Sequence, residues 1–257
     1  MSAGKPGILY LLPAPLQPYE AGAWEPAALA QSIPAAALRL LGTLDCFIVE
    51  SERTALRLLS RLRDKEGMER LSLGILDEHS SELEIPGLLK ELLAGKDCGF
   101  FTEAGMPCIA DPGAALVSFA HSRGIKLVPV AGPSSIVLAL TASGLDAQRF
   151  AFLGYLPQER SARRVAIQKT ARDIVQDGMT RLFIETPYRN EALLADCAAL
   201  LPDELWLCVA IGLCGPEEKI MSMPAALWRA HPLPKLGKVP AVFLFGQKSG
   251  LKPRNTR

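Results

Sequence analysis

The feature of the sequence that most constrains its fold is a regular alternation of short apolar runs and helix-like stretches in the first half. The runs hold Val, Ile, Leu and Phe without strict polar alternation, which is typical of strands covered on both faces, as in a parallel sheet. Helix-like stretches lie between them, so the pattern predicts successive βα units. The predicted strands are Gly7–Leu12, Cys46–Glu50, Leu71–Leu76, Asp97–Phe101 and Lys126–Val130. The predicted helices are Pro26–Leu41 with a break at Pro34, Glu52–Leu62, Ile85–Leu93 and Pro112–Arg123.

The pattern changes after Val130. Two consecutive strands begin near Leu205 and Lys219 with no helix between them, which predicts a mixed sheet. We therefore expect an α/β protein of two domains, residues 1–130 with a parallel five-stranded sheet and residues 131–257 with a mixed sheet. The strands predicted in the second domain are Arg149–Gly154, Arg181–Glu185, Leu205–Ile211, Lys219–Met223 and Ala241–Gly246. The helices predicted there are Ile136–Ser143, Ser161–Arg172 and Asn190–Leu201.

Length and composition agree with this organisation and narrow the function. With 257 residues, 49% of them hydrophobic, the chain is long enough for two cores. No apolar run approaches the ~20 residues of a membrane span and no secretory signal is visible, so we expect a soluble, cytoplasmic protein without membrane contact. The cysteines and histidines lack the spacing of a zinc site, and we expect no metal. A net charge of +1 predicts that any nucleic-acid contact is local.

The residues that follow the predicted parallel strands are the candidates for a ligand site. Ligands of open parallel sheets bind outside the carboxyl ends of the strands. The segment Thr102–Gly113 is the most informative, because it places glycines, prolines and two carboxylates between a strand and a helix. Asp111 followed by Pro112 predicts a helix start with Asp111 as the N-cap, in preference to a catalytic role. The chain has neither a G-x-G-x-x-G nor a P-loop sequence, which disfavours hydride and phosphoryl transfer.

Several segments, taken in order, carry a resemblance to a known family. They are GILYLLPAP (7–15), VESERT (49–54), DEHS (77–80), TEAGMPCIADPG (102–113), VPVAGPSS (128–135), SGLDAQRFAFLGYLP (143–157) and FIETPYR (183–189). On these segments the chain resembles the tetrapyrrole-methylase superfamily of S-adenosylmethionine-dependent methyltransferases. Within it, the closest resemblance is to the bacterial small-subunit ribosomal RNA cytidine ribose 2′-O-methyltransferases. The matching segments span nearly the whole chain.

This resemblance implies two α/β domains, a cleft between them that holds S-adenosylmethionine, and a homodimer. It also implies which residues touch the cofactor. They are Pro13, Thr102, Glu103, Ala104, Gly105, Ile109, Ser134, Ser135, Tyr155, Leu156, Glu185, Ala210 and Pro240. Packing at a domain interface is the alternative for most of them; for Ala210 and Pro240 the two interpretations are evenly balanced.

Two departures from the family concern the acceptor. The chain has PLQP at 15–18 where the RNA branch has PIGN, and IGLC at 211–214 where that branch has an acidic residue and a threonine. The leading hypothesis is methyl transfer to RNA, at a ribose 2′-oxygen of ribosomal RNA. A methyltransferase for a small molecule such as a tetrapyrrole-like compound, or a cofactor-binding protein without catalysis, are the alternatives.

A ribose hydroxyl needs a proton acceptor as the new bond forms. The candidate bases are Glu50, Glu103, Asp111, Glu185 and His79. We expect Glu50, Arg53 and His79 on the substrate side, with Arg53 holding a phosphate and His79 accepting a proton or binding a base. Alternatively, Arg53 pairs with Glu50 or Glu52, and His79 is structural.

Basic residues on the helix predicted after Pro157 form a second candidate surface, either for an RNA backbone or as an ordinary solvated face. They are Arg160, Arg163, Arg164, Lys169 and Arg172. Tyr188 and Arg189 are candidates to stack on a base or to cap the following helix.

Overall fold

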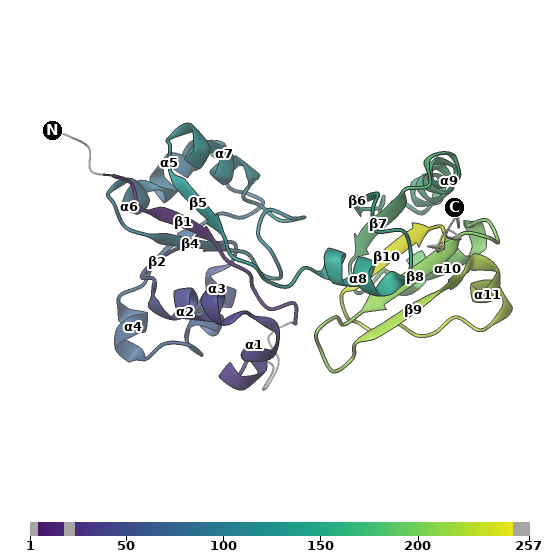
Figure 1. Cartoon of the computed structure of the whole chain (residues 1–257), viewed down its shortest axis with the longest axis horizontal. Helices are drawn as coiled ribbons and strands as arrows, with labels where there is room; N and C mark the ends of the chain where they lie inside the picture. The colour runs from purple at the N-terminus through teal and green to yellow at the C-terminus, as the bar shows by residue number, and fades with distance from the viewer. Residues whose placement is uncertain (1–4, 18–23, 249–257) are drawn as a thin grey trace, which may run out of the picture. The chain divides into compact units, whose positions relative to one another are not determined.

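A computed structural model of the chain describes residues 5–17 and 24–248 (Figure 1). The chain divides into two compact units, residues 1–134 and 135–257. Each unit contains one five-stranded sheet with helices packed against it.

The first unit contains the fully parallel sheet that the sequence predicts. The strand order is β3-β2-β4-β1-β5, and every neighbouring pair is parallel. The two inner strands β2 and β4 are buried at every position, as their uninterrupted apolar sequences predict. The strand bounds are β1 Ile8–Leu11, β2 Cys46–Val49, β3 Ser72–Ile75, β4 Cys98–Phe101 and β5 Lys126–Pro129.

Helices cover both faces of this sheet (Figure 1). On one face, Phe100 and Leu9 pack with residues of α5, α6 and α7. On the other, Phe47 and Phe101 pack with residues of α1, α2 and α3. The helix bounds are α1 Pro26–Ser32, α2 Ala35–Thr43, α3 Glu52–Leu59, α4 Lys65–Glu69, α5 Ile85–Leu88, α6 Lys90–Leu93 and α7 Ala114–Ser122, with the 3₁₀ turn η1 Glu82–Glu84 before α5.

The second unit contains the predicted mixed sheet. Its order is β6-β7-β10-β8-β9, where β6 and β7 are parallel and the other neighbours are antiparallel. The core lies between this sheet and α9, α10 and α11, with Phe183, Phe243 and Phe245 at its centre. The bounds are β6 Phe150–Tyr155, β7 Thr180–Glu185, β8 Trp206–Ile211, β9 Lys219–Pro224, β10 Ala241–Gly246, α8 Ser135–Ser143, α9 Arg160–Asp177, α10 Asn190–Leu200 and α11 Ala225–Ala230.

Most predicted elements are confirmed, and some details differ. Pro34 separates α1 from α2 as expected, because proline cannot continue the hydrogen-bond ladder of a helix. The helix predicted to end at Arg172 continues to Asp177 and ends at Gly178, which takes the left-handed conformation. The short helices α4 and α11 were not predicted. Over the described residues, every helix is too short or too polar to cross a membrane.

Candidate functional site

The loops at the carboxyl edge of the first sheet pack directly on one another. The sheet order makes β1 the neighbour of both β4 and β5, so the segments that follow these three strands meet. Ala14 and Gly105 form an isolated antiparallel bridge through two backbone hydrogen bonds of 2.8 and 3.0 Å. The predicted cofactor residues Pro13 and Thr102–Gly105 are therefore neighbours in space.

Two glycines allow this close approach. A Cβ atom on Gly132 would lie 2.1 Å from Cβ of Pro13, a distance at which the two loops would have to separate. Gly105 has a φ of +74°, and a Cβ there would lie 3.2 Å from Leu16 and 3.6 Å from the carbonyl oxygen of Pro133. Only glycine combines this conformation with this packing at low cost.

The loop between β4 and α7 has an unusual backbone. Besides Gly105 and Gly113, Cys108 and Ala110 have positive φ values of 68° and 66°. Over the described residues, Cys214 is the only other non-glycine residue with a positive φ. Left-handed non-glycine residues carry strain that persists only where the surrounding structure fixes it, and they concentrate at ligand sites.

A carboxylate from the neighbouring strand supports this loop. Oε2 of Glu50, directly after β2, accepts a hydrogen bond of 2.9 Å from the backbone N–H of Glu103. The hydroxyl of Thr54 donates to Oε1 of Glu103 at 2.8 Å. Burial raises the pKa of Glu50; the bond from Glu103 N–H opposes this, and the charges of Asp111 and Glu103 add to it. Glu50 thus both positions the loop and holds protons more tightly than an exposed glutamate.

Asp111 belongs to the same group of carboxylates, and its predicted role as a helix cap is wrong. The helix begins at Ala114 with Gly113 as the N-cap, and the cap makes no side-chain hydrogen bond. Oδ2 of Asp111 instead accepts a hydrogen bond of 2.7 Å from the buried hydroxyl of Thr102. Burial raises the pKa of Asp111, the bond from Thr102 lowers it, and the charge of Glu103 raises it. The Asp111–Thr102 bond ties the two ends of the loop together.

Arg53 and His79 occupy exposed positions beside this group. Among the described residues, Arg53 forms no ion pair with Glu50 or Glu52, contrary to the alternative weighed for it, and its side chain is exposed. The His79 side chain is 84% exposed, and its only ion-pair partner in the described chain is Glu78 at 3.6 Å. Its loop is held by Asp77, which accepts from His79 N–H at 2.9 Å.

The predicted cofactor residues of the second unit gather at one end of its sheet. Ala241 of β10 is paired with Glu185 on one side and with Ile211 on the other, so Glu185, Ala210 and Pro240 lie within one row of the sheet or beside it. Tyr155 at the end of β6 is paired with Ile184 and is 54% exposed. Leu156 is buried in the core, which fits its packing interpretation.

Unpaired polar atoms mark this end of the second sheet. Oε1 of the buried Glu185 accepts from Nη2 and Nε of Arg189 at 2.6 and 2.9 Å, while its Oε2 has no partner. Nη1 of Arg189 and Oδ1 of Asn190 are also buried without a partner, and these three are the only such atoms in the described part of the chain. Unpaired buried groups are costly, so this cluster fits a ligand with both donors and acceptors.

Further outcomes complete the comparison with the sequence. Arg189 occupies the N-cap position of α10, as one of its two interpretations expected, although its side chain makes no capping hydrogen bond; Tyr188 is 84% exposed. Ile109 is 46% exposed on the β4–α7 loop. Thr54 and Asn190 were not singled out from the sequence, because short polar residues beside strands carry no distinct signal. Of the two departures from the family pattern, Pro18 in the first loop lies outside the described residues.

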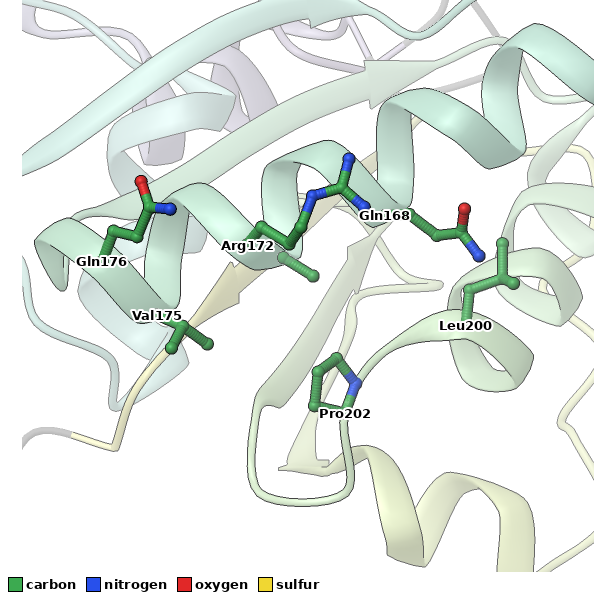
Figure 2. Close-up of a pocket in the computed structure, with 7 residues that line it drawn as sticks. Gln168, Arg172, Val175, Gln176, Leu200 and Pro202 are labelled. Atoms are coloured by element: carbon green, nitrogen blue, oxygen red, sulfur yellow. The ribbon is translucent and has the colours of Figure 1, made fainter.

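A separate hollow of about 420 Å³ lies on the second unit (Figure 2). Gln168, Arg172 and Val175 of α9 line one side, and Leu200 and Pro202 at the end of α10 line the other. Arg172 is the one residue of this lining that belongs to the predicted basic surface.

Comparisons with known proteins agree with the fold. A family model described as tetrapyrrole (corrin/porphyrin) methylases matches residues 29–226. The chain is 33% identical over 190 residues to a ribosomal RNA small subunit methyltransferase I of Pseudomonas aeruginosa, and 30% identical over 219 residues to one of Vibrio cholerae. These matches cover 74% and 85% of the chain but 64% and 69% of the relatives, so the chain spans about two thirds of their length. The crystal structure of the methyltransferase CobJ has a similar fold, with a TM-score of 0.59 and 13% identity over 94% of each chain.

Proposed function

Because the chain belongs to the tetrapyrrole (corrin/porphyrin) methylase family, we propose that it transfers a methyl group from S-adenosylmethionine to RNA. The acceptor we propose is a ribose 2′-hydroxyl of ribosomal RNA. The names of the relatives give small-subunit ribosomal RNA as the substrate of those proteins, and the ribose oxygen is what the family resemblance implies. The observation that carries the proposal is the strained, glycine-permitted loop between β4 and α7, which the Glu50 carboxylate and the Thr102–Asp111 bond hold in place.

The residues present fit the proposed cofactor in two respects. Gly105 and Gly132 let the loops after β1, β4 and β5 pack against one another, which brings their backbone N–H and C=O groups together at one edge of the sheet. Glu185, Arg189 and Asn190 offer unpaired polar atoms to the hydroxyl and amino groups of an adenosyl compound. The residues we propose to contact it are Pro13, Thr102, Glu103, Ala104, Gly105, Ile109, Ser134, Ser135, Tyr155, Leu156, Glu185, Ala210 and Pro240.

The bound cofactor would supply a methyl group on a positively charged sulfur. The chain's task is then to position the acceptor oxygen and to receive its proton, with the reacting atoms held in line at roughly 3–3.5 Å. Glu50 is the proton acceptor we favour, because burial raises its pKa towards the range in which a carboxylate is an effective general base. Its Oε1 has no hydrogen-bond partner among the described residues, whereas Oε2 holds the loop.

Arg53 and His79 are the residues we propose for contact with the substrate. Arg53 is exposed and has no carboxylate partner in the described chain, so its guanidinium is available to a phosphate. His79 extends into solvent from the loop after β3, and Glu78 of this loop is close enough to Glu50 to affect its pKa.

The proposal is tested by incubating the purified protein with labelled S-adenosylmethionine and bulk ribosomal RNA, followed by nuclease digestion. Label in a 2′-O-methylated nucleoside is the expected result. Label in a small molecule added in parallel, with none in RNA, would favour the small-molecule alternative. Binding of S-adenosylhomocysteine without turnover on any acceptor would favour the non-catalytic alternative, and absence of binding would refute the whole proposal.

Two further proposals concern assembly and location. We propose that the chain forms a homodimer, as the family resemblance implies. Light scattering at micromolar concentration tests the oligomeric state, and the mass of a monomer would contradict the proposal. The edge strand β6 exposes Phe150 and Leu153 by 44% and 45%, which is consistent with a covered surface. We propose a cytoplasmic location from the proposed substrate, and cell fractionation tests it.

A further inference from the structure

The five basic residues predicted as one surface on α9 separate into distinct groups in the structure. Lys169 pairs with Asp173 of the same helix at 2.7 Å. Arg172 lies apart, at the hollow in Figure 2. Arg160, Arg163 and Arg164, in contrast, all point to one acceptor, the carboxylate of Asp196 on α10.

The carboxylate of Asp196 holds three guanidinium groups at once. Arg163 donates from Nε and Nη2 to Oδ2 at 3.1 and 2.7 Å. Arg164 donates from Nη1 to Oδ1 at 2.9 Å, and Nε of Arg160 lies 3.5 Å from the same oxygen. Three positive charges against one negative charge leave two in excess. The N-cap Glu159 reduces the excess to one, but its carboxylate is occupied by Ser161 and Ala162.

Burial divides this arginine cluster into an inner and an outer part. The side chains of Arg163 and Asp196 are 6% and 3% exposed, so they form the buried, fixed part of the cluster. Those of Arg160 and Arg164 are 74% and 38% exposed. Apart from their bonds to Asp196, neither outer guanidinium has another partner in the described part of the chain. Their remaining N–H groups are therefore presented to solvent from an anchored position.

We propose that Arg160 and Arg164 form a binding site for phosphate groups of an RNA backbone, with Asp196 and Arg163 as positioning residues. The inference rests on the proposed RNA substrate. A planar guanidinium held at one edge offers the other edge to phosphate oxygens in a fork, and anchoring reduces the conformational entropy lost on binding. The cluster follows Tyr155 and Leu156 closely in the chain, so an RNA at that end of the second sheet passes near it.

The test measures binding of a fluorescent single-stranded RNA by anisotropy at several salt concentrations. The variant is R160A/R164A, and R172A is the matched control on the same helix outside the cluster. Each lost contact with a single strand flattens the slope of log K against log salt by about 0.7, so the double variant loses about 1.4 in slope and roughly 25-fold in affinity at 0.1 M salt. The expected result for R172A is an unchanged slope, and R160K/R164K, which keeps the charges, retains most of the slope of the natural protein.

The outcomes separate this inference from the proposed activity. An unchanged slope in R160A/R164A, an equal loss in R172A, or no RNA binding by the natural protein at low salt overturns the phosphate site. Arginine-dependent RNA binding without methyl transfer leaves the site standing and overturns the proposed reaction. If R160A/R164A methylates RNA and binds it with unchanged affinity and slope, the proposed reaction stands and the phosphate site is overturned. Thermal unfolding of each variant shows that a lost slope does not reflect lost folding.

Discussion

Replacing Asp196 by alanine tests how far one carboxylate stabilises the second unit. The substitution leaves the guanidinium of Arg163, whose side chain is 6% exposed, without its counter-charge. It also leaves Arg160 and Arg164 close to that buried charge. Removing one partner of a buried ion pair costs about 3–5 kcal/mol, because the remaining charge is neither hydrated nor neutralised. We expect D196A to lose that amount of unfolding free energy.

The matched control is D173A on α9. Its pair with Lys169 has a similar distance of 2.7 Å, but the two side chains are 35% and 69% exposed. Exposed helical pairs contribute about 0.3–0.5 kcal/mol. Urea unfolding followed by tryptophan fluorescence is the assay, since Trp206 and Trp228 both lie in this unit. With a slope of about 2 kcal/mol per molar urea, the midpoint falls by about 1.5–2.5 M for D196A and by about 0.2 M for D173A.

The pH dependence provides a second readout. Burial alone would raise the pKa of Asp196, but the hydrogen bonds from Arg163 and Arg164 hold it below its usual value. A lowered pKa in the folded state contributes stability above the unfolded pKa, which is lost as the pH falls through the folded pKa. The stabilities of the natural protein and D196A therefore converge in acid. Equal midpoints for D196A and D173A near neutral pH would refute the reasoning.

Three further predictions concern the first unit. G132A, whose Cβ would collide with the neighbouring loop, weakens S-adenosylhomocysteine binding at least tenfold by calorimetry. The control G87A has open space around the new Cβ and keeps the affinity of the natural protein. Equal affinities of G132A and G87A would contradict the argument that Gly132 allows the loops to approach closely. E50Q removes the acidic limb of the methyl-transfer pH profile. The carboxyl group of Glu50 becomes a charged base only as the pH rises past its raised pKa. A pH profile identical to that of the natural protein would exclude Glu50 as the base. R53A lowers the rate of methyl transfer to RNA about tenfold or more, while the free energies of cofactor binding and of unfolding stay within about 0.5 kcal/mol of those of the natural protein. Weakened cofactor binding would instead place Arg53 at the cofactor.

The sheets were predictable because their signal is local. Buried strands such as β2 and β4 need apolar side chains on both faces, so they are visible in the sequence as runs of consecutive apolar residues. Pro34 likewise acts on its own helix turn. The loop after β4 was recognisable by its glycines, because a positive φ favours one residue type.

The side-chain partners were not predictable, because they come from distant segments. Asp111 has the local sequence of a helix cap, but Gly113 takes that position and the hydroxyl of Thr102, nine residues earlier, binds the carboxylate. Arg163 falls on what periodicity presents as a solvated basic surface, and its acceptor Asp196 lies 33 residues later on another helix. Helical spacing in a single sequence shows which residues share a face of one helix, but it does not show which residue of another helix they pair with.

The strand order of the first unit has a consequence for synthesis on the ribosome. The strand β1 leaves the exit tunnel before its two neighbours β4 and β5, and Leu9 pairs with Cys98 and with Leu127. Its backbone groups therefore wait until roughly a hundred more residues have been translated, at about 5–20 residues per second. During those seconds the nascent chain carries an apolar strand whose two neighbours in the sheet have not yet been made.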